Sequence, residues 1–239
     1  MAVLLAVRQL QAFVDEWLGQ GLPAPADAMR RAGFRPDVPW SWCPRCGGAR
    51  HGAASRSGSR CRAAEAGAGA PGRVVRLGAH DGALRRWVVD VKHAGWEPMA
   101  EALGEALGRQ LLACGAVARA DAGTVLVSVP SPWLRTAARG MDHAAAIARG
   151  ASRATGVRVR RPIAQRLGGS QVDATGRESR VARAPRFRAR WRGARAVAGR
   201  HVVLVDDVRT TGTTLADAAR VLRALGAARV TAAVVSVRE

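Results

Sequence analysis

One stretch near the end of the chain constrains its fold more than any other. The run 201–205, with four apolar residues, is followed by Asp206 and Asp207, then by hydroxyls and glycine over 210–214, and then by a helical pattern over 215–225. A short apolar run of this kind is typical of a buried strand in a parallel sheet. Ligands bind open α/β sheets at the carboxyl ends of the strands. The two carboxylates and the loop are therefore predicted to lie at a binding edge.

The loop itself predicts a phosphate site. A loop that enters a helix presents unpaired N–H groups and the positive end of the helix dipole, which attract anions. Gly212 allows the backbone to turn and to approach a phosphate closely. Further donors are the hydroxyls of Thr210, Thr211, Thr213 and Thr214.

The adjacent acids define the rest of the ligand. Asp206 and Asp207 repel a phosphate, so they fit sugar hydroxyls, or a Mg²⁺ ion that bridges to a second phosphate. The predicted ligand is a sugar that carries a 5′-phosphate beside its hydroxyls. The competing interpretation is an edge turn in which the two acids form a solvated helix cap. A pair of acids alone favours that turn, whereas the full strand, acid pair, loop and helix favour the ligand.

From residue 73 onward, strands alternate with helices. The pattern predicts strands at 74–77, at 125–129, within 157–167 and at 230–237, and helices from Asp81, from Pro98 to Leu112, and over 142–155. This alternation predicts an α/β fold with a mostly parallel sheet flanked by helices. Residues 168–184 have almost no large apolar side chain, which predicts a long exposed loop.

The chain is strongly basic, with a formal net charge of +20. Of its 38 basic residues all but Lys92 are arginine, which fits the codon bias of a GC-rich genome. That bias does not explain why basic residues outnumber acidic residues by 20. Segment 133–200 holds 17 arginines against three acidic residues, a net of +14, which attracts polyanions such as pyrophosphate or DNA. Aromatic rings suited to base stacking within it are only Trp133 and Trp191.

Four cysteines occur in a chain that is otherwise rich in alanine and glycine. Cys43 and Cys46 form a CxxC pair, and Cys61 has no CxxC partner on either side. A cytosolic chain seldom forms disulfides, so this spacing indicates metal or redox chemistry. His51 could complete a zinc site with these three cysteines. The alternative is a degenerate ribbon that binds no metal. Cys114 ends an apolar helix and is predicted to be a small buried side chain.

Several stretches together resemble the ComF/GntX family, over nearly all of the chain. They are Trp42–Gly47, Val74–His93, Val127–Pro130 followed by Arg139–His143, Gln171–Arg180, and the acid pair with its loop. The last of these resembles the phosphoribosyl pyrophosphate motif of type I phosphoribosyltransferases. The resemblance implies a helical segment at 1–36, a degenerate zinc-ribbon-like segment and linker at 37–72, and a phosphoribosyltransferase-like domain at 73–239.

The resemblance also implies a chemistry. Asp206 and Asp207 are expected to hold the ribose directly or through Mg²⁺, and 168–184 to close over the substrate. Groups expected near the pyrophosphate are Lys92, Arg135, Arg139, Gly140 and Arg180. The family is implicated in DNA uptake and competence, and the acceptor is not implied. A second hypothesis is a nucleic-acid-binding accessory protein that uses the arginine-rich face.

The sequence gives no indication of a membrane protein. No apolar run approaches the ~18 residues that a bilayer span requires. The first apolar stretch, 2–7, lacks a basic leader and continues into a pattern that predicts an amphipathic helix over 1–18. These features favour the cytoplasm.

Overall fold

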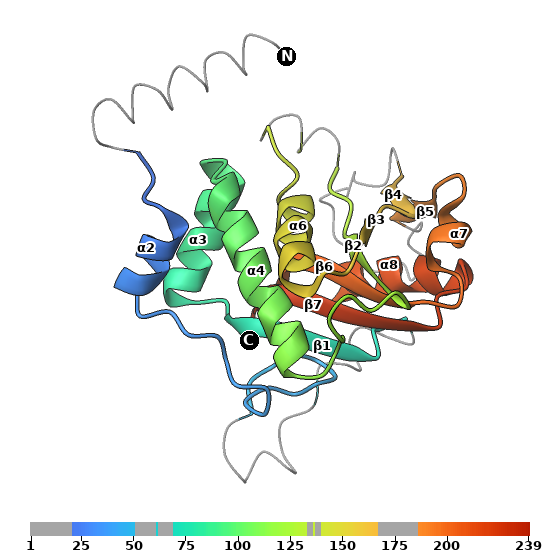
Figure 1. Cartoon of the computed structure of the whole chain (residues 1–239), viewed down its shortest axis with the longest axis horizontal. Coiled ribbons are helices and arrows are strands. Elements are labelled where there is room, and N and C mark those ends of the chain that lie inside the picture. The colour runs from blue at the N-terminus through green and yellow to red at the C-terminus, as the bar shows by residue number, and fades with distance from the viewer. Residues whose placement is uncertain (1–20, 51–60, 62–68, 133–135, 137–139, 167–185) are drawn as a thin grey trace, which may run out of the picture.

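A five-stranded sheet forms the centre of the molecule in the computed structural model, which describes residues 21–50, 61, 69–132, 136, 140–166 and 186–239. Its strands lie in the order β1 (Arg73–Ala79), β7 (Arg229–Val237), β6 (His201–Arg209), β2 (Thr124–Ser128) and β3 (Val159–Arg160), and every neighbouring pair is parallel. The expected α/β fold is confirmed (Figure 1).

Helices cover both faces of this sheet. On one face lie α3 (Gly82–His93), α4 (Glu97–Ala113) and α6 (His143–Thr155), and on the other lies α8 (Thr213–Ala224) with α7 (Gly193–Val197) (Figure 1). Successive residues of a strand point to opposite faces, so β6 supplies both cores. Val203 and Val205 pack under α4 and α6, while Val202 and Leu204 pack under α8. Within the described residues, no helix is both long and apolar enough to cross a bilayer.

The strands and helices differ from the sequence prediction in several details. Strand β6 continues to Arg209 instead of ending at residue 205, because it keeps its register with β7 as far as Val237. The region 157–167 holds two short strands, β3 and β4 (Ile163–Gln165), and β4 pairs antiparallel with β5 (Phe187–Ala189), which the sequence does not predict. Helix α7 is also new. The predicted elements at 1–18 and 168–184 lie outside the described residues.

Two of the predicted helix starts behave differently. Asp142 accepts a hydrogen bond from the N–H of Ala145 at 3.1 Å, so its side chain caps α6. Asp81 stands at the N-cap of α3 but its side chain makes no capping hydrogen bond. The helix therefore begins where the sequence predicts, without a cap from the Asp81 side chain.

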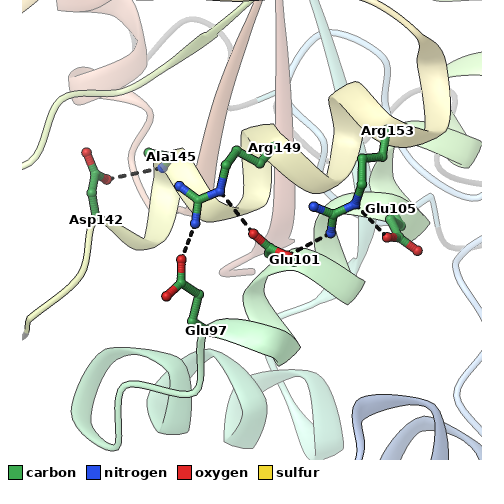
Figure 2. A network of polar contacts seen from close by, with 7 residues as sticks. All are labelled: Glu97, Glu101, Glu105, Asp142, Ala145, Arg149 and Arg153. Atoms are coloured by element: carbon green, nitrogen blue, oxygen red, sulfur yellow. Dashed lines mark hydrogen bonds and ion pairs between the residues drawn. The ribbon is translucent and has the colours of Figure 1, made fainter.

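Helices α4 and α6 pack in close backbone contact. A Cβ built on Gly104 would collide with the carbonyl of Ile147, and one on Gly150 would collide with the carbonyl of Glu101. Five charged side chains line the seam, where Arg149 bridges Glu97 and Glu101, and Arg153 bridges Glu101 and Glu105 (Figure 2). Glycine thus sets the spacing of the two helices, and the ion pairs lie along their exposed edge.

The segment before the sheet contributes to the core, although its sequence shows no core-forming period. Trp42 is 2% exposed, and its indole N–H donates to the carbonyl of Val74 at 3.1 Å. Arg76, 3% exposed, forms ion pairs with Asp37 and Glu239 at 2.7 Å each. Burying one guanidinium between two carboxylates fastens this segment to β1 and to the end of the chain. The short helix α2 (Pro25–Arg31) packs beside α4.

Candidate functional site

The acid pair lies in the last residues of β6, at the edge where all five parallel strands have their carboxyl ends. The backbone N–H of Asp207 donates to Oδ1 of Asp206 at 2.9 Å, and the N–H of Val208 donates to Oδ1 of Asp207 at 2.6 Å. The side chain of Asp207 is 9% exposed, whereas Asp206 is only partly buried. These backbone bonds fix both carboxyl groups at the edge that the sequence predicts.

Two neighbouring elements aim a nitrogen at Asp207. The ammonium of Lys92, in the last turn of α3, lies 2.6 Å from Oδ2, and Nε2 of His143 lies 3.3 Å from the same oxygen. His143 is the first residue of α6 and is buried. The sequence singles out Lys92 but not His143. The signal that could have found His143 is its place directly after the helix cap that follows β2, the strand beside β6.

The two carboxyl groups differ in acidity. Burial disfavours the charge on Asp207, but Lys92 and His143 outweigh it and lower the pKa of this carboxyl. Burial and the negative charge of its neighbour raise the pKa of Asp206 well above its ordinary value. Asp207 is therefore the ionised member of the pair, and Asp206 is the member that holds a proton more readily.

The predicted phosphate loop has the expected geometry. Gly212 adopts a left-handed conformation with φ of +82° and is the N-cap of α8, which begins at Thr213. The hydroxyls of Thr211 and Thr213 lie 3.1 Å apart. Thr210 and Thr211 are exposed at the turn. The start of α8 and the hydroxyls of Thr211 and Thr213 thus lie together at one turn.

Two arginines that the sequence does not single out border this loop. Nη1 of Arg186 donates to the hydroxyl of Thr214 at 3.0 Å, and Arg209 is buried against Gly212. Arg186 comes from a distant part of the chain, and no local pattern signals it. Arg209 lies within the motif itself and could have been noticed as a cation between the acids and the threonines.

The remaining predicted residues fall into two groups. Gly140 is exposed, with φ of +74°, and leads into α6. Arg135, Arg139 and Arg180 lie outside the described residues, so the structure does not place them. A hollow of about 260 Å³ lies between α2 and α4, and its lining contains none of the predicted site residues.

The three cysteines form a cluster of their own. The Sγ atoms of Cys43, Cys46 and Cys61 all lie within 4.8 Å of one another, and those of Cys43 and Cys61 are 3.7 Å apart. Burial raises the pKa of the Cys46 thiol to about 11. Burial also acts against ionisation of Cys43, but hydrogen bonds from the backbone at Cys46 and Arg45 lower its pKa overall. His51 lies outside the described residues.

A parallel sheet with an acid pair and a phosphate-type loop at its carboxyl edge defines a phosphoribosyltransferase-like α/β fold. Residues 132–238 match the phosphoribosyl transferase domain family. A solved structure described as that of the allosteric regulatory enzyme of purine biosynthesis is similar over 57% of this chain, with 24% identity and a TM-score of 0.39. The match covers 26% of that longer chain. A comparison with curated proteins finds no match.

Proposed function

We propose that the protein is a phosphoribosyltransferase that binds phosphoribosyl pyrophosphate at the carboxyl end of β6. The observation that carries this proposal is the continuity of Asp206 and Asp207 with the helix-capping loop 210–214 inside the matched domain. Sugar hydroxyls donate to carboxylates, and a phosphate accepts from the N–H groups at the start of α8. A single ligand that carries sugar hydroxyls beside a phosphate can pair with both the acids and the loop.

The reaction requires positioning more than covalent help from the protein. The bond from ribose C1 to the pyrophosphate oxygen breaks, the pyrophosphate leaves with the electron pair, and the acceptor's nucleophilic atom bonds to C1 and loses its proton. Positive side chains stabilise the departing charge. That role falls to Arg135, Arg139 and Arg180 by their resemblance to the family motifs, and the loop 168–184 is expected to exclude water. The acceptor is not specified by any residue described.

Magnesium fits the acid pair poorly. Mg²⁺ requires oxygen ligands at about 2.0–2.1 Å in an octahedral arrangement. Oδ1 of Asp207 accepts from the N–H of Val208, and Oδ2 forms an ion pair with the ammonium of Lys92 at 2.6 Å. Oδ1 of Asp206 accepts from the N–H of Asp207. The ammonium at Oδ2 of Asp207 therefore argues against the expectation that this carboxylate holds Mg²⁺, and no step is assigned to the metal.

Calorimetric titration with phosphoribosyl pyrophosphate tests the proposal. The wild-type protein is expected to release or absorb heat with one site per chain. Asp206→Asn should weaken binding by about tenfold or more, because an amide accepts a sugar hydroxyl less strongly than a carboxyl pair does. Asp27→Asn, on helix α2, which has no buried residue, is the matched control and should bind as the wild type does. Absence of heat with the folded wild type would refute the proposal.

The cysteine cluster fits a structural zinc site, which we propose as a second feature. Zinc–sulfur bonds of about 2.3 Å in a tetrahedron place two sulfurs about 3.8 Å apart. The Sγ atoms of Cys43 and Cys61 are separated by 3.7 Å, and the N–H of Gly47 donates to the carbonyl of Cys43 in the tight turn between the CxxC thiols. Such a site would add a link within a segment already held by Trp42 and Arg76.

A second candidate function is nucleic-acid binding, favoured by one exposed aromatic ring. Trp191 is 91% exposed and lies between Arg190 and Arg192, both exposed, with Arg188 exposed on the adjoining strand β5. An aromatic ring among arginines is a stacking platform for single-stranded nucleic acid. Trp191→Ala should weaken binding of a single-stranded oligonucleotide, and the exposed Trp40→Ala should not. The link to DNA uptake that the family resemblance implies depends on this function.

A further inference from the structure

We propose that the ammonium of Lys92 is the resident cation of the sugar-phosphate site, in the place on Asp207 that a magnesium ion would need. This inference rests on the proposed function, since it concerns how that site accommodates its ligand. It predicts that the site binds a sugar phosphate without Mg²⁺. It also gives a role to the single lysine in a chain whose other 37 basic residues are arginine.

The geometry of Asp207 supports the proposal first. The Nζ atom of Lys92 lies 2.6 Å from Oδ2, which is an ion pair with hydrogen-bond length. His143 approaches the same oxygen at 3.3 Å from the side of α6. The opposite oxygen accepts from the N–H of Val208. A metal could bind Oδ2 of Asp207 only after Lys92 had moved away from it.

The burial of the pair supports it further. The side chain of Lys92 is 25% exposed and that of Asp207 is 9% exposed, so water screens their attraction only weakly. A dication placed at the same carboxylate would lie close to the ammonium and be repelled by it. Charge neutralisation at this carboxylate is thus already provided by the protein itself.

The kind of cation is also informative. Lysine presents a compact point charge on a flexible stem, whereas arginine presents a planar fork. The compact ammonium of Lys92 can take the position beside Oδ2 of Asp207 that a metal ion would take. It leaves the neighbouring carboxyl of Asp206 accessible to a sugar hydroxyl, since that residue remains partly exposed.

The test measures how Mg²⁺ changes the binding of ribose 5-phosphate. This probe has the sugar hydroxyls and the 5′-phosphate but no pyrophosphate, which would itself bind Mg²⁺. Any Mg²⁺ requirement for its binding therefore points to the carboxylates of the protein. Calorimetry is run in excess Mg²⁺ and in EDTA. The wild type should bind with dissociation constants that agree within about threefold. Lys92→Met should bind at least about tenfold more weakly in EDTA and recover with Mg²⁺, which can then reach Asp207.

Two further variants isolate the role of charge. Lys92→Arg keeps the positive charge and should remain independent of Mg²⁺. Arg86→Met removes one positive charge from an exposed position on the same helix and should behave as the wild type. The measured quantity is the ratio of the affinities of one variant in the two buffers. A smaller fraction of folded protein would affect both buffers alike and would not change this ratio.

The outcomes separate this inference from the proposed function. A wild type that binds ribose 5-phosphate only with Mg²⁺, or not at all, overturns the role of Lys92. So does a Lys92→Met variant that loses affinity equally in both buffers. The titration with phosphoribosyl pyrophosphate tests the proposed function independently. If the protein binds that ligand, the proposed function holds whether or not ribose 5-phosphate binding requires Mg²⁺.

Discussion

The guanidinium of Arg209 lies against the α-carbon of Gly212, so that a Cβ added to this glycine would be 2.9 Å from Nε. Both residues belong to the connection between β6 and α8, and Arg209 is 4% exposed. The buried arginine therefore sets the space beneath the loop, and Gly212 is required both for its left-handed backbone and for the absence of a side chain.

Gly212→Val should abolish sugar-phosphate binding while the domain remains folded. The β-branched side chain would displace Arg209 and strain a backbone whose φ is +82°, at a cost of about 1–2 kcal/mol for the left-handed conformation. Calorimetry gives the affinity and urea unfolding gives the stability.

Gly199→Val is the matched control for that variant. Gly199 has φ of +68°, but a Cβ there would meet nothing within 4 Å. Gly199→Val should lower the free energy of unfolding by a comparable amount, because of its left-handed backbone, and should leave sugar-phosphate binding unchanged. Equal affinities for Gly212→Val and wild type would place the phosphate elsewhere.

The double variant Asp206→Asn with Asp207→Asn separates the two candidate functions. Sugar-phosphate binding should weaken strongly, because both carboxylates are lost. Affinity for DNA should hold or rise slightly, because the negative charge of the acid pair is removed and the exposed arginines beside Trp191 remain. The salt dependence of DNA binding should keep its slope. A parallel loss of both activities at unchanged stability would mean that they share one site.

Elemental analysis of protein purified without chelator should find about one zinc per chain, since three thiols converge. Cys61→Ser should remove it, and Cys114→Ser, outside the cluster, should not. Loss of zinc in His51→Ala would identify His51 as the fourth ligand. Wild-type protein without zinc would leave the interpretation of a degenerate ribbon.

Acid should destabilise the protein through His201. Burial and the nearby Arg229 lower the pKa of His201 from 6.5 to about 4, so the folded state binds fewer protons than the unfolded state between these values. Stability is then fully present above pH 6.5 and falls as the pH drops towards 4, by at most about 1.4 kcal/mol per pH unit. Urea midpoints across this window should fall less steeply for His201→Gln than for the wild type. The exposed His93→Gln should follow the wild type.

Gly150→Ala should destabilise the fold by about 1–3 kcal/mol, because the added methyl would push α6 away from α4 at the carbonyl of Glu101. Gly72→Ala serves as its control, since the nearest atom to a Cβ there is 3.8 Å away. Thermal unfolding distinguishes them. Equal melting temperatures would show that the helices can separate without cost.

The sequence predicts most of the sheet because parallel strands buried on both faces read as continuous apolar runs, as at 125–129 and 230–237. It predicts the loop at Gly212 for a similarly local reason, since acids, hydroxyls and glycine follow one strand. These features depend on residues close together in the chain, and the structure places them where expected.

What the sequence does not predict depends on distant contacts. His143 acquires its meaning only when α6 and β6 come together, and Arg186 only when β5 lies near α8. Trp42 joins the hydrophobic core while the carbonyl of Val74 on β1 accepts from its indole N–H, which no period within 37–72 indicates. The length of β6 is likewise set by its neighbour, because β7 offers partners as far as Val237.

The order of the strands also has a consequence for how the chain folds during its synthesis. Strand β7 follows the other described strands in the chain and lies between β1 and β6, so the pairing of β1 with the rest of the sheet waits for residues 229–237. A nascent chain lacks this central strand and exposes the apolar edges of both its neighbours. Since domains form on the ribosome as their residues emerge, slow translation of residues 229–237 would prolong an aggregation-prone intermediate. We therefore expect that the protein depends on chaperones during its expression.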